Sequence, residues 1–137
     1  MPLYMCNAVK GAIDDAAKPK IAEDITRIHC DVTGAPPEFV HAFFVEDSPA
    51  QPLDGKSAFL FGNIRAGRTD EQKAQIVSEM RQSIHQHTGI PLDEIKAATT
   101  DTPASWVLEG GEIMPEPGEE AEWMAKHKAH KSAGTAA

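Results

Sequence analysis

The residues of this chain best suited to chemistry are a proline at position 2, one histidine, two arginines and one glutamate. If Met1 is removed, Pro2 becomes the amino terminus and its nitrogen is a free secondary amine. Such an amine titrates nearer neutrality than lysine does, and burial beside apolar residues lowers its pKa further. We therefore expect Pro2 to act as a general base at pH 7, or as a general acid where nearby carboxylates keep it protonated.

The other four residues are His29, Arg65, Arg68 and Glu109, and each has an ordinary structural interpretation when it is taken alone. A histidine beside an apolar stripe is usually half-buried and structural. The two arginines flank Ala-Gly in an expected turn, where such cations are usually solvated, although guanidinium groups also bind carboxylates bidentately. Glu109 precedes two glycines and has the setting of a turn carboxylate. The case for a site depends on whether the fold gathers these groups.

Hydrophobic spacing predicts four strands and two helices around these residues. The strands are expected where apolar residues alternate or run together, and the helices where they recur every three or four positions. Each helix has a start signal, Asp14 for the first and Thr69 with Gln72 for the second, and each ends at a glycine, Gly34 or Gly89. The expected strands cover Leu3 to Asn7, Phe39 to Val45, Ala58 to Ile64 and Ile95 to Thr100.

The two halves of the chain look like copies of one strand-helix-strand unit. Thr33-Gly34-Ala35-Pro36 precedes Thr88-Gly89-Ile90-Pro91 by 55 residues, and the same shift superimposes the apolar stripes of the two expected helices. We therefore predict repeats at about residues 2–47 and 57–102 within a single domain of residues 1–137, with a C-terminal extension at 103–137. At this shift Pro2 corresponds to Ser57.

The predicted fold class is α/β (α+β), with a four-stranded mixed sheet and both helices on one face. In each unit a right-handed crossover makes the two strands parallel. The linker between the units is too short for another crossover, so the second unit should run antiparallel to the first. The uncovered face of the sheet is expected to be buried against other subunits. This topology would bring the amine, the imidazole, the guanidiniums and the carboxylate to one edge of the sheet.

Composition limits the classes of partner. The chain has 137 residues and a formal net charge of −8, which argues against nucleic acid or an anionic membrane as a partner, and its apolar runs are too short to span a bilayer. A cytoplasmic location is expected, with Cys6 and Cys30 as reduced thiols. His85 and His87 would point to different faces of a helix, so we expect no metal site, and no phosphate-binding or nucleotide motif indicates a cofactor.

At these residues the sequence resembles the tautomerase superfamily and, within it, the cis-3-chloroacrylic acid dehalogenase group, whose members are fused double copies of a short β-α-β unit and assemble as trimers. The resemblance runs from about Pro2 to Trp123. Its markers are Pro2-Leu-Tyr-Met5, Ile21-Ala-Glu-Asp-Ile-Thr-Arg-Ile-His29, Arg65-Ala-Gly-Arg68 and Glu109-Gly-Gly-Glu-Ile-Met-Pro-Glu-Pro-Gly-Glu-Glu-Ala-Glu-Trp123.

The resemblance implies a role for each candidate residue. The matches are Pro2 to the catalytic amine, His29, Arg65 and Arg68 to the group that binds the substrate carboxylate, and Glu109 to the glutamate that helps activate water in the dehalogenase. Two positions depart from the dehalogenase pattern, because Ala98 and Gly110 stand where the dehalogenase has tyrosines.

These departures favour tautomerisation over hydration. In hydration or dehalogenation of an acrylate, protonated Pro2 would donate a proton while Glu109, with His29, directs water, and an assisting tyrosine is missing. Keto-enol proton transfer does not depend on that tyrosine. We therefore predict an isomerase, a cofactor-independent homotrimeric tautomerase for small 2-oxo acids, with weaker hydratase or hydrolytic dehalogenase activity on 3-substituted acrylates. The alternatives are a dehalogenase of the cis-3-chloroacrylic acid type and a non-catalytic trimeric binding module.

Overall fold

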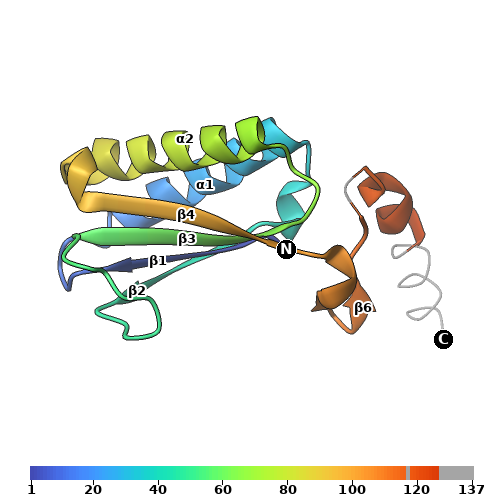
Figure 1. The fold of residues 1–137 in the computed structure, drawn as a ribbon, viewed down its shortest axis with the longest axis horizontal. Helices are drawn as coiled ribbons and strands as arrows, with labels where there is room; N and C mark the ends of the chain where they lie inside the picture. The colour runs from blue at the N-terminus through green and yellow to red at the C-terminus, as the bar shows by residue number, and fades with distance from the viewer. Residues whose placement is uncertain (117, 127–137) are drawn as a thin grey trace.

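The computed structural model describes residues 1–116 and 118–126, and its main body is a four-stranded mixed sheet with two helices on one face (Figure 1). The sheet order is β2-β1-β3-β4, with β1 parallel to β2, β3 parallel to β4, and β1 antiparallel to β3. The elements are β1 (Leu3–Ala8), α1 (Ala17–Thr33), β2 (His41–Glu46), β3 (Ala58–Arg65), α2 (Asp70–Thr88) and β4 (Ile95–Thr102). The predicted fold class and strand directions are confirmed.

The two helices begin differently and end alike. Thr69 and Gln72 form the predicted capping box of α2, in which each side chain accepts a hydrogen bond from the other residue's backbone N–H. Pro19 predicts that the regular part of the first helix starts after Asp14, nearer Lys18, and α1 begins at Ala17, whose N–H donates to the Asp14 carboxylate over 2.8 Å. This later start leaves Pro19 within the first helical turn, where a proline removes no intrahelical hydrogen bond. Both helices end at a glycine with φ of 76°.

Two predicted strand boundaries are wrong by a few residues. Phe39 does not belong to β2, because Pro37–Phe39 form a 3-10 turn (η1) in which the N–H of Val40 donates to the Pro37 carbonyl. Strand β2 therefore begins only at His41. Arg65 is the last residue of β3 rather than the residue after it, since β4 extends far enough to pair with it. Both differences shift residues at the edge where β1 begins.

The repeat shift of 55 residues holds for the helices but not for the first strand of each unit. In the first unit, Leu3 of β1 pairs with β2 at a certain position. In the second unit, Phe59 of β3 pairs with β4 at the equivalent position. Pro2 therefore corresponds to Ala58, and the expected match to Ser57 is wrong by one residue. Side chains alternate between the faces of a strand, so this register keeps Leu3 and Phe59 on the same face of the sheet.

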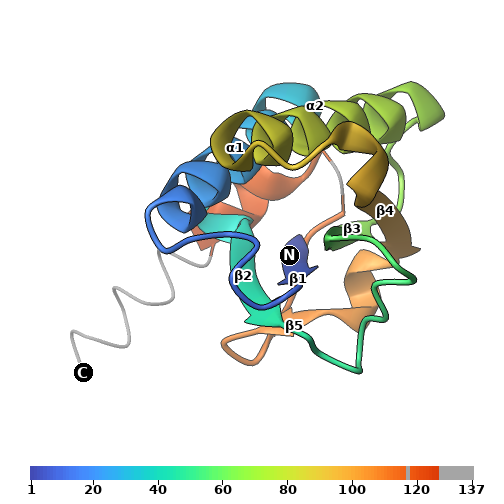
Figure 2. The same ribbon diagram turned by 90° about the vertical axis from the view of Figure 1, so that its left-hand side faces the viewer.

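The main hydrophobic core lies between the sheet and the two helices, which Figure 2 shows on the same side of the strands. Isoleucines of α1 and α2 pack there against inward-facing residues of the strands, among them Tyr4, Cys6 and Leu60. The opposite face of the sheet carries apolar side chains as well. On that face Phe59 stacks on Phe61, and the isolated chain leaves an apolar surface of the kind that mediates association.

The segment after β4 lies at the end of the sheet where β1 begins (Figure 1). It contains the 3-10 turn η3 (Ala104–Trp106), the two short strands β5 (Leu108–Glu109) and β6 (Glu112–Ile113), and a helical segment over residues 120–126. Gly110 and Gly111 make the β5–β6 turn with positive φ angles of 59° and 81°, a conformation in which a tyrosine at 110 would be strained. The amphipathic pattern predicts helix from 119 to 131 and a loose tail to 137, and residues 127–137 lie outside the described residues.

This segment has a small core of its own and packs against the main body. Buried Phe39, Ala104 and Met114 form the cluster, with Trp123 packed against it. The Trp123 indole N–H donates to the Ile113 carbonyl over 2.9 Å, which fixes the helical segment to β6. Within residues 1–116 and 118–126, no helix is long and apolar enough to cross a membrane.

Candidate active site

The amino terminus is the centre of the candidate site. Met1 and Pro2 are buried at the start of β1, and the Pro2 carbonyl accepts a hydrogen bond of 3.0 Å from the His41 N–H. The Met1 amine donates to the Phe39 carbonyl over 2.9 Å and forms an ion pair with the Glu109 carboxylate. The structure thus places Glu109, which is 108 positions away in the chain, directly against the amine.

The surroundings of the amine set its acidity. Burial lowers the pKa of this amine from 8.0 to about 6, and the positive charge of Arg65 lowers it in the same direction. The Glu109 carboxylate acts in the opposite direction, because a neighbouring negative charge favours the protonated amine. An amine in this position is therefore suited to exchanging a proton near pH 7.

His29 lies in the last turns of α1 and is held by Tyr4 of β1. The Tyr4 hydroxyl lies 2.8 Å from His29 Nδ1, and both side chains are buried. The tyrosine ring fits over Gly62 of the neighbouring strand, where an added Cβ would lie 2.4 Å from Tyr4 Cε1. As predicted, α1 returns toward the start of β1, and its His29 contacts Tyr4, which lies two strand positions after Pro2 on the same face of the sheet.

His29 is uncharged at neutral pH. Burial lowers the pKa of the imidazole from 6.5 to about 3, and the charges of Arg68, Arg65 and the amino terminus lower it further in the same direction. A neutral imidazole has one ring nitrogen that donates and one that accepts. His29 can therefore orient a ligand or a water molecule through a hydrogen bond, but it contributes no positive charge to carboxylate binding.

The low pKa of His29 predicts a loss of stability in acid. The unfolded histidine binds a proton below pH 6.5 and the folded one does so only near pH 3, so the free energy of unfolding falls as the pH falls through this window. Between pH 7 and pH 5 this one group should lower the free energy of unfolding by about 2 kcal/mol. Urea unfolding of the wild type and of His29→Gln at both pH values measures this loss. Between the two pH values, the free energy of unfolding should fall by about 2 kcal/mol less in the variant than in the wild type.

The exposed histidine of β2 provides the control for this experiment. His41, whose side chain is 57% exposed, remains in contact with solvent when the chain folds. The His41→Gln variant therefore makes the same substitution at an exposed position and controls for the change of residue itself. Equal acid dependence in the wild type and in His29→Gln would contradict a neutral, buried His29.

Arg65 and Arg68 meet at a carboxylate of the C-terminal segment, Glu120. The Arg65 Nη2 lies 2.6 Å from Glu120 Oε1, its Nη1 donates to the Pro115 carbonyl, and its guanidinium lies 5.8 Å from the centre of the Phe39 ring. The Arg68 Nη2 lies 3.6 Å from the same Glu120 oxygen. The side chains are 1%, 7% and 12% exposed for Arg65, Arg68 and Glu120, so all three charges are largely removed from water.

The two guanidiniums differ in how far their donors are used. Arg65 is enclosed by the C-terminal segment and binds it through both Nη atoms. Arg68 donates a long hydrogen bond of 3.4 Å to the Thr33 carbonyl and lies at ion-pair distance from Glu120, and its buried Nε has no hydrogen-bond partner among the described residues. Buried donors are normally satisfied, so Arg68 is the arginine with capacity for a ligand.

The charges of this group influence one another. Burial lowers the pKa of Arg68, and the neighbouring Arg65 lowers it further, while Glu120 acts in the opposite direction. Burial alone would raise the pKa of Glu120, but the hydrogen bonds from backbone N–H groups and from Arg65 leave it below its usual value. Glu120 is therefore an ionised carboxylate bound between two guanidiniums.

All five residues singled out from the sequence lie at this edge of the structure, and the sequence analysis missed three that contact them. Tyr4 could have been found, because it lies two positions after Pro2 on an alternating strand. Glu120 and the Phe39 carbonyl carry no such signal. The histidines set aside have ordinary contacts, with His85 Nδ1 2.7 Å from the Ile90 carbonyl and His87 Nε2 2.9 Å from an Asp24 oxygen.

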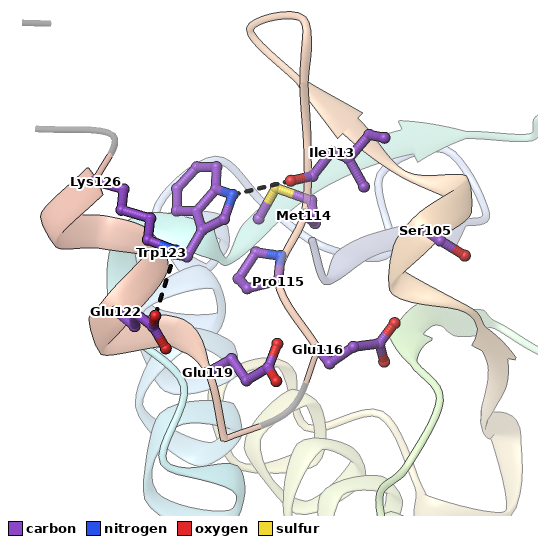
Figure 3. Close-up of a pocket in the computed structure, with 9 residues that line it drawn as sticks. All are labelled: Ser105, Ile113, Met114, Pro115, Glu116, Glu119, Glu122, Trp123 and Lys126. Carbon is purple, nitrogen blue, oxygen red and sulfur yellow. Dashed lines mark hydrogen bonds and ion pairs between the residues drawn. The ribbon is translucent and has the colours of Figure 1, made fainter. Parts of the chain in front are cut away.

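Other features of the described part of the chain do not add to this site. Within residues 1–116 and 118–126, no group of three His, Cys, Asp or Glu side chains is placed to hold a metal ion. Cys6 and Cys30 are free thiols, and burial raises the pKa of Cys6 to about 12, so it is an unreactive core residue. A groove of about 440 Å³ lies on the outer side of the C-terminal segment, lined by Trp123, Glu116 and Glu119 among others (Figure 3).

The structure thus has the two antiparallel β-α-β units that the resemblance to the tautomerase superfamily implies. The chain belongs to the Tautomerase_3 family, whose model, described as "Putative oxalocrotonate tautomerase enzyme", matches residues 1–128. The resemblance to this superfamily and to its cis-dehalogenase group is confirmed.

Two similar proteins support this assignment, and a third shows the same fold. The crystal structure of N1, a member of the cis-3-chloroacrylic acid dehalogenase family, superimposes with a TM-score of 0.80 at 27% identity and covers 90% of each chain. "Probable tautomerase LL0574" of Lactococcus lactis subsp. lactis (strain IL1403) is 43% identical over 47 residues, which are 34% of this chain and 77% of that protein. A fused 4-OT described as a symmetric trimer shares the fold, with a TM-score of 0.70, 21% identity and coverage of 82% and 94%.

Proposed function

We propose that this chain is a cofactor-independent tautomerase of small 2-oxo acids, in which the secondary amine of Pro2 moves the proton after Met1 is removed. The observation that carries the proposal is the buried amino-terminal position against Glu109, where burial lowers the pKa of the Met1 amine to about 6 and would act in the same direction on the Pro2 amine. Met1 now fills the space beside Pro2, since its side chain is only 8% exposed. Its removal would leave the Pro2 nitrogen facing that space.

The neighbouring groups fit the steps of keto-enol transfer. Neutral Pro2 would take a proton from the carbon next to the ketone and return it to the oxygen, or run the same steps in reverse. The Arg68 guanidinium would bind the substrate carboxylate and stabilise the negative charge that develops on the enolate oxygen. His29 and Tyr4, both uncharged, would orient the substrate through hydrogen bonds.

A second activity, hydrolytic dehalogenation of 3-chloroacrylates, is favoured by the position of Glu109. Its Oε1 contacts the amine and its Oε2 lies 4.0 Å from His41 Nε2, so the carboxylate could direct a water molecule beside the proton donor. The two tyrosines of the dehalogenase group are replaced by Gly110 and Ala98. Gly110 makes a tight turn, and Ala98 lies on the face of the sheet away from Tyr4. We therefore propose this activity as the weaker one.

We further propose a homotrimer as the working assembly. The support is the apolar outer face of the sheet, where Leu3 and Phe43 are 39% and 42% exposed in the single chain. Exposed apolar surface of this kind is usually covered by association. The fused 4-OT relative described as a trimer has the same fold.

Parallel assays on the purified native protein test the proposed function. Intact mass first establishes whether Met1 is absent. The enol form of an aryl 2-oxo acid is then followed by absorbance, and chloride release from cis-3-chloroacrylate is followed beside it, with Glu109→Gln as the variant for both. In the wild type we expect the enol to be lost faster than it is without enzyme. We expect chloride release to be slower than this loss of the enol.

Each outcome distinguishes one candidate function. Chloride release that is faster than enol loss and depends on Glu109 would make the dehalogenase the principal activity. Retention of Met1, with no acceleration of either reaction, would contradict both activities and leave the non-catalytic binding module.

A further inference from the structure

We propose that Glu120 determines the substrate class of this site by occupying the position in which Arg65 would bind a second carboxylate. The proposed function supplies the reaction, and Glu120 restricts it to monocarboxylic 2-oxo acids. Glu120 would thus act as an internal carboxylate, built into the C-terminal segment and directed at the arginines.

The contacts of Glu120 are those expected of a bound carboxylate. One oxygen accepts from Arg65 Nη2 over 2.6 Å and lies 3.6 Å from Arg68 Nη2. The other oxygen accepts a 2.8 Å hydrogen bond from the Gly118 N–H. Charge-assisted contacts from guanidinium and backbone donors are the usual means of binding a substrate carboxylate. The position is therefore filled by the chain itself.

Both Nη atoms of Arg65 already contact the C-terminal segment, one at Glu120 and the other at the Pro115 carbonyl. Arg68 retains a buried Nε without a partner among the described residues. Arg68 is therefore the guanidinium that is less engaged by the chain and better able to bind a substrate carboxylate, while a carboxylate of the chain, Glu120, already lies against Arg65.

The charges lead to the same restriction. Arg65 and Arg68 together carry two positive charges, and Glu120 neutralises one of them within a largely buried cluster. A monocarboxylate would complete the charge balance. A dicarboxylate would bring a second negative charge close to Glu120, and like charges in a buried site repel strongly.

Glu120→Gln is the variant that isolates this charge. Glutamine keeps the shape and one acceptor oxygen for Arg65, while the negative charge and the oxygen that accepts from the Gly118 N–H are lost. The Glu119→Gln variant makes the same change of net charge one residue earlier, where the side chain is exposed and lines the outer groove (Figure 3). Glu120→Asp keeps the charge and serves as the conservative variant.

The measurement is the calorimetric dissociation constant of two unreactive acids of equal length, pentanoate and pentanedioate. We expect Glu120→Gln to tighten pentanedioate relative to pentanoate by at least about tenfold, the lower end of the effect of a close buried charge pair. Glu119→Gln and Glu120→Asp should keep the wild-type ratio. Circular dichroism checks that each variant is folded.

Several results would overturn the proposal. They are an unchanged ratio in Glu120→Gln, an equal gain for both acids, the same shift in Glu119→Gln, or no binding of either acid to Glu120→Gln. Because binding is measured without turnover, failure of the proposed function would appear separately, as an absence of enol conversion in a wild type that still discriminates between the acids.

Discussion

Replacing Pro2 by alanine is expected to lower kcat/KM for enol conversion by about 10²-fold, at the lower end of the range for removal of a general acid or base. Alanine still leaves a terminal amine after removal of Met1, so some proton transfer should survive. The pyrrolidine ring that fixes the direction of the nitrogen is lost, and misplacement of the reacting group accounts for the decrease. Initial rates with the enol form of an aryl 2-oxo acid measure the effect.

A matched proline lies at the opposite end of the sheet. The turn between α2 and β4 lies at the far end of the sheet from the amino terminus (Figure 1), and Pro91 is exposed in that turn. The Pro91→Ala variant should keep the wild-type rate. Intact mass of each variant confirms the identity of the terminal residue, and a Pro2→Ala enzyme that lacks Met1 and retains the full rate would refute the role of the amine.

Most of the fold follows from local patterns in the sequence. The spacing of isoleucines fixes both helices, the capping box fixes the start of α2, and Gly34 and Gly89 fix where the helices end. The short linker then permits only an antiparallel arrangement of the two units. The register of the first strands could not be read in this way, because apolar residues on both faces of β3 conceal which face points to the helices.

The candidate site was predictable where topology alone positions a residue. The return of α1 brings His29 to β1, and the repeat offers a further sign, since the residue 55 positions later is the buried core residue Ile84. A histidine in the place of an isoleucine indicates a polar contact in the first unit, and in the structure its partner is the Tyr4 hydroxyl.

The contacts of Arg65 with the C-terminal segment were not predictable from the sequence. Glu120 lies 55 residues after Arg65, and although an amphipathic pattern predicts a helix there, the contact depends on how that segment folds back against the sheet. From the sequence alone, the two arginines were therefore expected to have equivalent roles. In the structure Arg65 holds the C-terminal segment, and Arg68 has the free donor.

This difference predicts that Arg68→Gln will reduce kcat/KM by about 10²-fold or more, mainly through a higher KM. Removing one member of a buried, hydrogen-bonded charge pair typically costs about 2–5 kcal/mol, and each 1.4 kcal/mol corresponds to a factor of ten. Arg68→Lys should recover part of the loss, because lysine restores the charge without the planar fork of donors. Steady-state rates over a range of 2-oxo acid concentrations separate KM from kcat.

The surface arginine of α1 is the control. Arg27 is 57% exposed and pairs with Asp24 and Asp31 on the outer side of the helix, so Arg27→Gln should leave both KM and kcat unchanged. Arg65→Gln should behave differently from both, because it releases the contacts to Glu120 and Pro115 and should lower the thermal stability of the C-terminal segment. A change of about threefold corresponds to less than 1.4 kcal/mol, which is the free energy of a tenfold change. If Arg68→Gln changed kcat/KM by no more than about threefold, the substrate carboxylate would have to bind elsewhere.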